Sequence, residues 1–329
     1  DSGTFITNGV QRVVVNQMHR SPGAFFDHDK GKSHASGKLL FNCRVIPNRG
    51  SWLDFEYDVK DFLYFRIDRK KKILVSSLLL ALGYTKPEIV NEFYEKETFT
   101  YNLTANKWKT KFNPDNYRAK NFSEEVADSK SGKIVIKLGD KINFLSAKKL
   151  SNDGLKDIFV TNDSLFGKFL HKDIKINEEE IFKIGTELNE TILQTIIDAK
   201  ISSIDISNTN PINKGPYLLS TICNDKNETK SEAITEIYKV LRPGEPPTEE
   251  IATQIFNNLF FTSDRYDLSD VGRVKMNSRL NLDCSDKITI LRNDDILAIV
   301  RKMLDLRDGK DEVDDIDHLG NRRVRSVGE

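Results

Sequence analysis

Alternating apolar and polar residues in the first third of the chain predict short β-strands. The apolar positions are mostly valine, isoleucine, leucine and aromatic residues. Gly9 separates the first two strands, and Pro47-Asn48-Arg49-Gly50 provides a turn between the third and the fourth. The stretches with this pattern are 5–8, 11–16, 39–46, 52–57 and 62–67.

The pattern then changes to one that is typical of helices. We expect a helix over 73–82, because Gly83 suits the residue that follows a helix C-terminus. Thr85 and Glu88 have the spacing of a capping box, in which each residue binds a free backbone amide of the other. This motif predicts a second helix that runs to about Tyr94.

Two more helices are expected in the last third of the chain. A proline-rich connector ends at Thr248, which is a good N-cap for a helix over 249–261. Its apolar stripe is expected at Ile251, Ile255 and Leu259. The helix over 294–306 has four apolar residues at helical spacing: Ile296, Ile299, Val300 and Met303.

The middle of the chain contains an apparent internal duplication. Gly139-Asp140-Lys141-Ile142-Asn143 and Gly185-Thr186-Glu187-Leu188-Asn189 are related by a shift of 46 residues, which further apolar positions share. Each copy predicts a helix followed by a short strand, so 95–213 is expected to be a separate α+β module. Chance similarity in a chain rich in Ile, Lys and Asn is the alternative.

Length and composition indicate a globular protein. The length of 329 residues predicts about two domains, and 38% hydrophobic with 30% charged residues indicates a globular chain. The net charge is zero, but residues 1–90 hold 14 basic and 9 acidic side chains, which favours a polyanion partner near the front.

The chain gives no sign of secretion or of membrane insertion. Cys43, Cys223 and Cys284 lie too far apart for a disulfide framework or a zinc cluster, which favours a reducing compartment. No apolar run is long enough for a transmembrane helix. The chain starts with Asp1 and not with Met, so we expect a piece of a longer protein.

Chemical motifs for catalysis are missing from the sequence. The five histidines have no metal-ligand spacing, and His19 with Ser21 lacks a group that would orient a nucleophile. Two candidates for nucleic-acid binding remain. The basic run 66–72 could bind DNA or be a solvated face, and Trp52 could be a core residue or an exposed platform for a base.

Six motifs occur in the order that is typical of one family. They are Gln17–Gly23, Arg49–Glu56, Arg66–Arg69, Arg242–Pro247, Asp264–Leu268 and Asp314–Arg323. On these motifs the chain resembles the bacterial RNA polymerase β subunit, densely in 1–93 and 214–329 and weakly between them. The resemblance implies an internal fragment of that subunit.

The implied fold class is α+β, with mixed short-strand sheets and helices that form the polymerase β lobe and an inserted smaller α+β module. A stub over 1–22 joins the lobe to the protrusion, and 318–329 is the return stub. The lobe itself is expected over 23–94 and 214–317, and 95–213 is the inserted module.

The resemblance also implies roles for single residues. In this family the lobe forms a wall of the downstream DNA cleft and contacts bases of the non-template strand. Trp52 matches the tryptophan that stacks on an unpaired base. Four residues match part of the pocket for the next flipped base, which favours guanine: Arg20, Ile316, Asp317 and Arg322. An aspartate can accept hydrogen bonds from guanine, and arginine can donate to it or neutralise a phosphate.

Further residues match two neighbouring surfaces of the family. The basic surface that faces DNA is matched by Lys32, Arg69 and Lys70. Relatives often have arginine at 70 and 71, so bidentate contacts are lost here. The lobe-side edge of the rifamycin pocket is matched by Arg12, Val15 and Gln17.

The implied partners are DNA, the polymerase subunits β′, α and ω, σ factor, and regulators that bind 95–213. The resemblance implies no catalytic residue, metal site or cofactor in this fragment, because the magnesium-binding aspartates belong to β′. The expected location is the cytoplasm, at the nucleoid. Two other interpretations stay open: a protein-docking scaffold, and a helix-turn-helix DNA-binding module over 73–94.

Overall fold

A computed structural model describes residues 3–117, 120–121, 125–210 and 214–328 of the chain. Two compact units are present: Asp1–Val75 with Ser231–Glu329, called unit 1, and Ser76–Lys230, called unit 2. Unit 2 contains the expected module 95–213 and extends beyond it at both ends. The expected boundary at 213, like residues 1, 2 and 329 of the stubs, lies outside the described residues.

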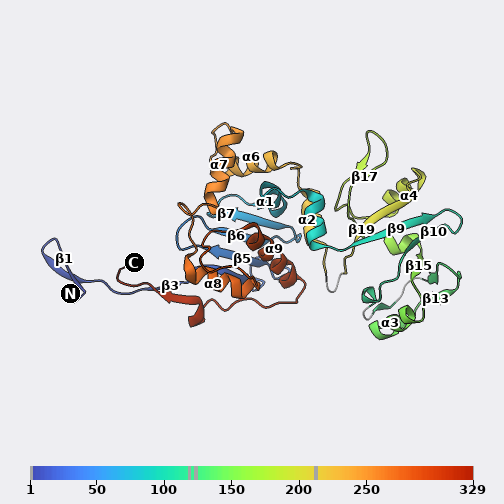
Figure 1. Cartoon of the computed structure of the whole chain (residues 1–329), viewed down its shortest axis with the longest axis horizontal. Coiled ribbons are helices and arrows are strands. Elements are labelled where there is room, and N and C mark those ends of the chain that lie inside the picture. Colours follow the sequence, from blue (N-terminus) through green and yellow to red (C-terminus); the bar gives the residue numbers. More distant parts are fainter. Residues whose placement is uncertain (1–2, 118–119, 122–124, 211–213, 329) are drawn as a thin grey trace. The chain divides into compact units, whose positions relative to one another are not determined.

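A five-stranded antiparallel sheet forms the centre of unit 1 (Figure 1). Its strands follow one another in chain order and pair with their neighbours, which makes a meander. The strands expected over 39–67 are confirmed, whereas the first strand was not predicted. The strands are β4 (Gly23–His28), β5 (Phe41–Ile46), β6 (Leu53–Tyr57), β7 (Leu63–Ile67) and β8 (Ile73–Leu74).

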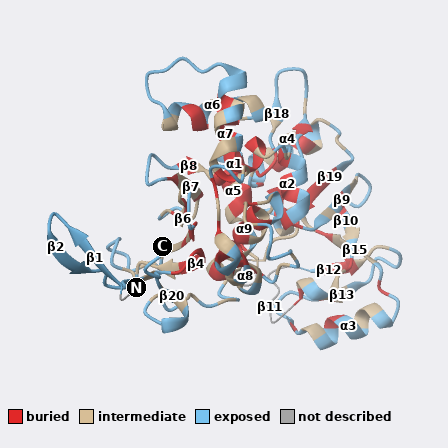
Figure 2. Cartoon of the chain, turned by 60° about the vertical axis from the view of Figure 1, so that its left-hand side comes forward, coloured by how far each residue is buried: buried red, intermediate tan, exposed pale blue. Residues whose placement is uncertain are grey.

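Two further pairs of strands belong to the ends of the chain. β1 (Thr4–Thr7) and β2 (Val10–Val13) form the expected hairpin, and all their residues are exposed (Figure 2). β3 (Met18–Arg20) pairs with β20 (Arg322–Val324), which follows the short 3₁₀ helix η3 (Leu319–Asn321).

Four helices complete unit 1. They are α6 (Lys230–Leu241), α7 (Glu249–Phe260), α8 (Ser269–Leu280) and α9 (Asn293–Arg307). α8 packs against β4, and α9 packs against β5. The core that results joins sheet and helix side chains that are fully buried, among them Phe26, Leu53, Phe55, Phe65, Met276, Ile299 and Met303.

The buried face of α7 differs from the prediction. Ala252, Phe256 and Phe260 face the core, and Ile251 at the expected stripe is 47% exposed. Within each set the residues recur every four positions, so the spacing alone is compatible with either set as the buried face. The larger aromatic side chains bury more apolar area and take the core side. The four apolar positions of α9 are buried as expected.

Unit 2 begins with helices. α1 (Val75–Ala81) starts two residues later than predicted, because 73–74 belong to β8. The capping box is confirmed: Thr85 and Glu88 bind each other's backbone amides at the start of α2 (Lys86–Phe93). α5 (Tyr217–Asn224) follows the module in the chain.

A seven-stranded sheet with strand order β13-β12-β15-β10-β9-β19-β16 is the framework of unit 2. Its strands are β9 (Lys96–Asn102), β10 (Lys107–Lys111), β12 (Val126–Asp128), β13 (Ile134–Ile136), β15 (Asp157–Val160), β16 (Phe169–Leu170) and β19 (Ser203–Ser207). Two small pairs stand apart from it: β11 (Lys120–Asn121) with β14 (Lys141–Ile142), and β17 (Ile174–Lys175) with β18 (Ile181–Phe182). Helices α3 (Phe144–Asn152) and α4 (Glu190–Asp198) and the 3₁₀ turns η1 (Pro114–Asn116) and η2 (Asn162–Leu165) complete it.

The duplicated pattern has the same local structure in both copies. Asn143 caps α3 and Asn189 caps α4 through the same side-chain contact to the third residue beyond. Each helix is followed by a strand of the seven-stranded sheet, β15 or β19. The predicted order of helix and strand is therefore confirmed, and both copies share one apolar core around Trp108.

Candidate nucleic-acid interface

Residues from opposite ends of the sequence meet at the β3–β20 pair in unit 1. Arg322 lies directly opposite Arg20 in this antiparallel pair, and the backbone amide of Ser21 donates to the Asn321 carbonyl at 3.1 Å. The tail of the chain therefore folds back beside Arg20. Side chains of directly opposite residues start about 5 Å apart, so the two arginine side chains leave the strand pair on the same face.

Asp317 stands beside this arginine pair. Its Oδ1 accepts a hydrogen bond from Nη2 of Arg322 at 3.2 Å, and its side chain is 87% exposed. Ile316 next to it is half-buried. Like charges on directly opposite residues of a strand pair repel each other, and the Asp317 carboxylate pairs with Arg322. The cluster offers acceptors and donors that a guanine edge or a phosphate would match.

Arg279 anchors the tail that carries this cluster. Its guanidinium binds Asp314 at 2.7 Å and Asp311 at 3.2 Å, and it also donates to the Glu312 carbonyl. Asp314 in turn accepts from the Phe26 amide at 2.8 Å. The segment before Asp317 is therefore bound to α8 and β4. Sequence reasoning missed Arg279, because no motif links a lone arginine to carboxylates more than 30 residues away.

Trp52 lies immediately before β6 and is half-buried. The guanidinium carbons of Arg44 and Arg69 each lie 5.6 Å from its ring centre, within the range of cation–π contacts. The backbone of Trp52 pairs with Asp68 through two hydrogen bonds of 2.8 and 3.0 Å. Two cations thus lie near the ring, and Trp52 is not one of the buried core residues.

Arg69 owes its position to a tight turn. Asp68 and Arg69 both have positive φ angles of 48° and 59°, and the Lys70 amide closes the turn on Ile67. Two such residues define a type I′ turn, which matches the twist of a hairpin. Lys70 is directed elsewhere, because its ammonium donates to the Leu241 carbonyl at the end of α6 at 2.7 Å.

Lys32 lies on a separate loop between β4 and β5. The Asp29 carboxylate accepts from the amides of Gly31, Ser33 and Leu40, and these hydrogen bonds hold its pKa well below the ordinary value. Gly31 has a φ of 70°, and a Cβ there would lie 2.7 Å from the Gly37 carbonyl oxygen. Only glycine fits this approach, and the loop exposes Lys32.

The three residues matched to the rifamycin pocket lie near the front of the chain. Arg12 in β2 is exposed, and Val15 is 79% exposed. The carbonyl of Gln17 accepts from the Arg325 amide at 3.1 Å.

The surface of α1 and α2 argues against a helix-turn-helix reader. The residues of α1 are buried, and the exposed face of α2 carries Glu88, Asn91 and Glu92, whose two carboxylates would repel phosphates. Within the part of the chain that the structure describes, no cluster of His, Cys, Asp or Glu could hold a metal ion. Nor does that part contain a helix that is long and apolar enough to cross a membrane.

The sequence matches a family model described as RNA polymerase Rpb2, domain 2, over residues 20–149 and 177–325. DNA-directed RNA polymerase β subunits of Rickettsia conorii and Rhizobium leguminosarum bv. trifolii are 50% and 51% identical to it. That of Chelativorans sp. is 50% identical. Each match covers 100% of this chain and 24% of the relative, so the chain spans about a quarter of their length. The chain belongs to the bacterial RNA polymerase β-subunit family, in which it corresponds to a region that contains Rpb2 domain 2.

Proposed function

We propose that the chain acts in transcription as the lobe region of the β subunit of DNA-directed RNA polymerase. In this role it forms a wall of the downstream DNA cleft and contacts bases of the non-template strand. The observation that carries the proposal is the cluster of Arg20, Arg322 and Asp317, which the β3–β20 pair assembles from both ends of the chain.

Each member of the interface has a distinct task. Trp52 stacks on an unpaired base, and Arg44 and Arg69 beside it attract the phosphates on either side. Asp317 accepts hydrogen bonds from the next base, a guanine, while the two arginines donate to it or to its phosphate. Ile316 supplies an apolar contact. Lys32 and Arg69 contribute charge toward the DNA backbone, whereas the Lys70 ammonium is bound to the Leu241 carbonyl.

This region positions DNA and performs no chemistry itself. Nucleotidyl transfer is the activity proposed for the whole enzyme, with magnesium held by the β′ subunit. The partners are β′, α and ω, σ factor, and DNA, in the cytoplasm at the nucleoid. Arg12, Val15 and Gln17 form an edge of the rifamycin pocket. We further propose that 95–213 docks proteins that regulate transcription.

The test uses assembled polymerase that carries Asp317→Ala, with Asp286→Ala as a matched control at another exposed carboxylate. Open-complex lifetimes are compared on promoters with each of the four bases at the position facing the pocket. We expect Asp317→Ala to remove about 1–3 kcal/mol of preference for guanine. The control should keep this preference. An equal loss on all four bases would contradict the assignment.

Trp52 is tested in the same polymerase. Trp52→Ala should cost roughly 1–3 kcal/mol of the contact to an unpaired base, whereas Trp52→Phe should keep most of it because a ring remains. Fluorescence of 2-aminopurine at the stacked position reports the contact directly. Unchanged fluorescence in the alanine variant would show that the base stacks elsewhere.

A further inference from the structure

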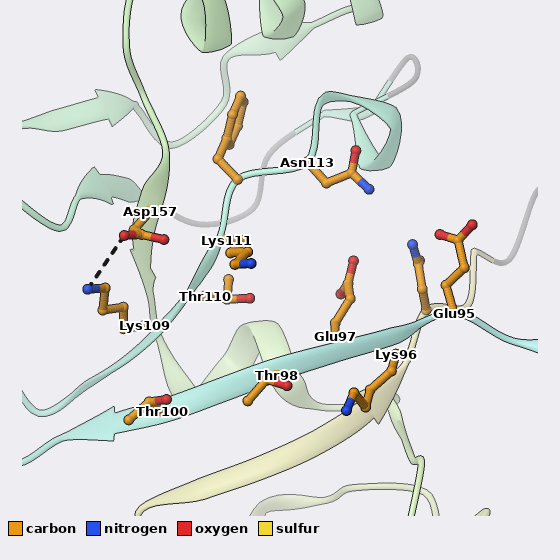
Figure 3. A pocket seen from close by; sticks show the side chains of 12 residues that line it. Glu95, Lys96, Glu97, Thr98, Thr100, Lys109, Thr110, Lys111, Asn113 and Asp157 are labelled. Atoms are coloured by element: carbon orange, nitrogen blue, oxygen red, sulfur yellow. Dashed lines mark ion pairs between the residues drawn. The ribbon is translucent and has the colours of Figure 1, made fainter. Parts of the chain in front are cut away.

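The seven-stranded sheet of unit 2 splits between β9 and β10. These two strands pair over only three positions, and the last pair is Lys109 with Thr100. Beyond this point β9 continues along β19, where Thr98 lies opposite Asp205. β10 continues along β15, where Lys111 lies opposite Asp157. Each strand thus follows its outer neighbour, and a gap opens between them (Figure 3).

A cavity of about 720 Å³ occupies this gap. Its volume lies within the range of pockets that hold small ligands. It is lined by residues of both separated strands and of the segments that extend them: Glu95, Lys96, Glu97, Thr98, Thr100, Lys109, Thr110, Lys111, Phe112, Asn113, Asp157 and Asn208. We call this cavity the β9–β10 gap.

The backbone of both strands faces the gap with hydrogen-bonding groups. The Tyr101 amide donates to the Ser202 carbonyl, and peptide groups alternate in direction along a strand. The backbone N–H and C=O groups of Thr98 therefore point away from β19 and into the gap. The Phe112 amide donates to Lys156 before β15, which directs the peptide group of Lys111 into the gap as well. Two strand edges thus face each other inside one sheet.

The side chains around the gap carry both signs of charge. Lys109 pairs with Asp157 at 3.5 Å, and Oε1 of Glu97 accepts from the side-chain Nδ2 of Asn116 at 2.5 Å. Lys111 is exposed at the end of β10, and Figure 3 shows it between the two separated strands. Glu95 and Glu97 would repel the phosphates of a nucleic acid. A polypeptide with charges of both signs matches this lining better.

We propose that the β9–β10 gap binds an extended peptide segment of mixed charge from a protein partner. The segment adds a strand to the free edge of β9 or β10, as in other cases of strand addition. Backbone hydrogen bonds to Thr98 or Lys111 supply affinity, and the lysines and glutamates select charged side chains of the partner. The inference rests on the docking role proposed for 95–213 and is independent of the DNA contacts in unit 1.

The test uses the full chain and a short acetylated peptide in which valine alternates with glutamate and lysine. A second form of this peptide carries N-methyl groups on alternate amides, which keeps the side chains but removes the backbone donors. We expect the first peptide to bind and to slow hydrogen exchange at the amides of Thr98 or Lys111. The N-methylated form should bind at least about tenfold more weakly, since it loses two or more hydrogen bonds.

Two substitutions of Lys111 distinguish the contribution of its backbone amide to peptide binding from that of its side-chain charge. Lys111→Gln removes the charge and keeps the amide, so it should weaken binding roughly two- to fivefold. Lys111→Pro also removes the backbone N–H of residue 111, which is not part of the β10–β15 ladder. Peptide affinity should therefore fall by a further factor of about two to ten. Lys107→Gln on the same strand lies outside the lining and is the control. Trp108 fluorescence verifies that each variant is folded.

Three results would overturn the inference. The first is no binding of the first peptide at millimolar concentration, and the second is equal binding of the N-methylated form. The third is equal affinity of the Pro and Gln variants together with unchanged hydrogen exchange at the Thr98 amide, because neither strand edge would then bind the peptide. None of these results would affect the test of Asp317. If a known regulator of the polymerase binds 95–213 while the peptide does not, docking survives and its assignment to the gap fails.

Discussion

A buried ion pair between α8 and α9 offers a sharp test of what stabilises unit 1. Arg273 and Asp295 are both 0% exposed, and two hydrogen bonds of 2.9 Å join them side by side. The same guanidinium donates to the carbonyls of Ile288 and Ile290. Asp295 also accepts from the Arg292 amide at the start of α9. The pair therefore connects two helices and the loop between them.

Asp295→Asn should be strongly destabilising. The substitution preserves shape but leaves a buried guanidinium without its counter-charge, which costs about 3–5 kcal/mol. Arg273→Met should cost a similar amount, because two carbonyls and a carboxylate lose a donor. The double variant should cost less than the sum, since it removes both buried charges together. Asp294→Asn is the control: its side chain is 69% exposed and its ion pair is long at 3.8 Å.

The two tryptophans make the measurement simple. Trp52 lies in unit 1 and Trp108 in unit 2, so a Trp108→Phe background lets fluorescence report on unit 1 alone. Urea unfolding then gives the free energy of unfolding for each variant. A loss below about 1 kcal/mol for Asp295→Asn would refute the reasoning, because exposed pairs reach that value. The reasoning would also be refuted if the losses in the free energy of unfolding of the two single variants simply added up in the double variant.

Two further predictions concern unit 2. Burial lowers the pKa of His171 below its ordinary value of 6.5, so the unfolded state binds the proton more readily. The free energy of unfolding should therefore fall as pH drops below about 6.5. His171→Gln should reduce this pH dependence, which urea unfolding followed by Trp108 fluorescence would measure. Replacement of 95–213 by a short Gly/Ser linker should leave unit 1 folding cooperatively. The residues next to the two ends of the deleted segment are close together, because the Tyr94 hydroxyl donates to the Gly215 carbonyl at 3.0 Å. Loss of cooperative unfolding monitored by Trp52 fluorescence would contradict this.

Local chemistry explains which elements could be predicted from the sequence. The turn before β6 needs Gly50, whose φ is 126° and where a Cβ would lie 2.7 Å from the Tyr266 ring. The capping box of Thr85 and Glu88 involves neighbours in the chain, so its pattern is sufficient. α8 was missed because it is polar on most sides and places Arg273 in the core. A buried arginine has no apolar pattern to reveal it.

The candidate interface depends on contacts between distant parts of the chain. Composition does not reveal the pairing of Arg20 with Arg322; only the resemblance to the family suggested it. The turn at Asp68 and Arg69 lacks the Asn-Gly pair that usually indicates a type I′ turn. The β9–β10 gap has no sequence pattern either, because both strands alternate normally and differ only in which neighbour they follow.

Stability and the proposed recognition are therefore linked through α8. One turn of this helix buries Arg273 against Asp295, and Arg279 near its end binds the tail through Asp314. Surface charges alone would hold the tail weakly, since exposed pairs contribute about 0–1 kcal/mol. The tail is anchored to a helix that the core holds in place. Asp317 would therefore lose little conformational entropy if it bound a base as proposed. The proposed recognition would thus use a cluster that is ordered before DNA binds, although none of its own charges is buried.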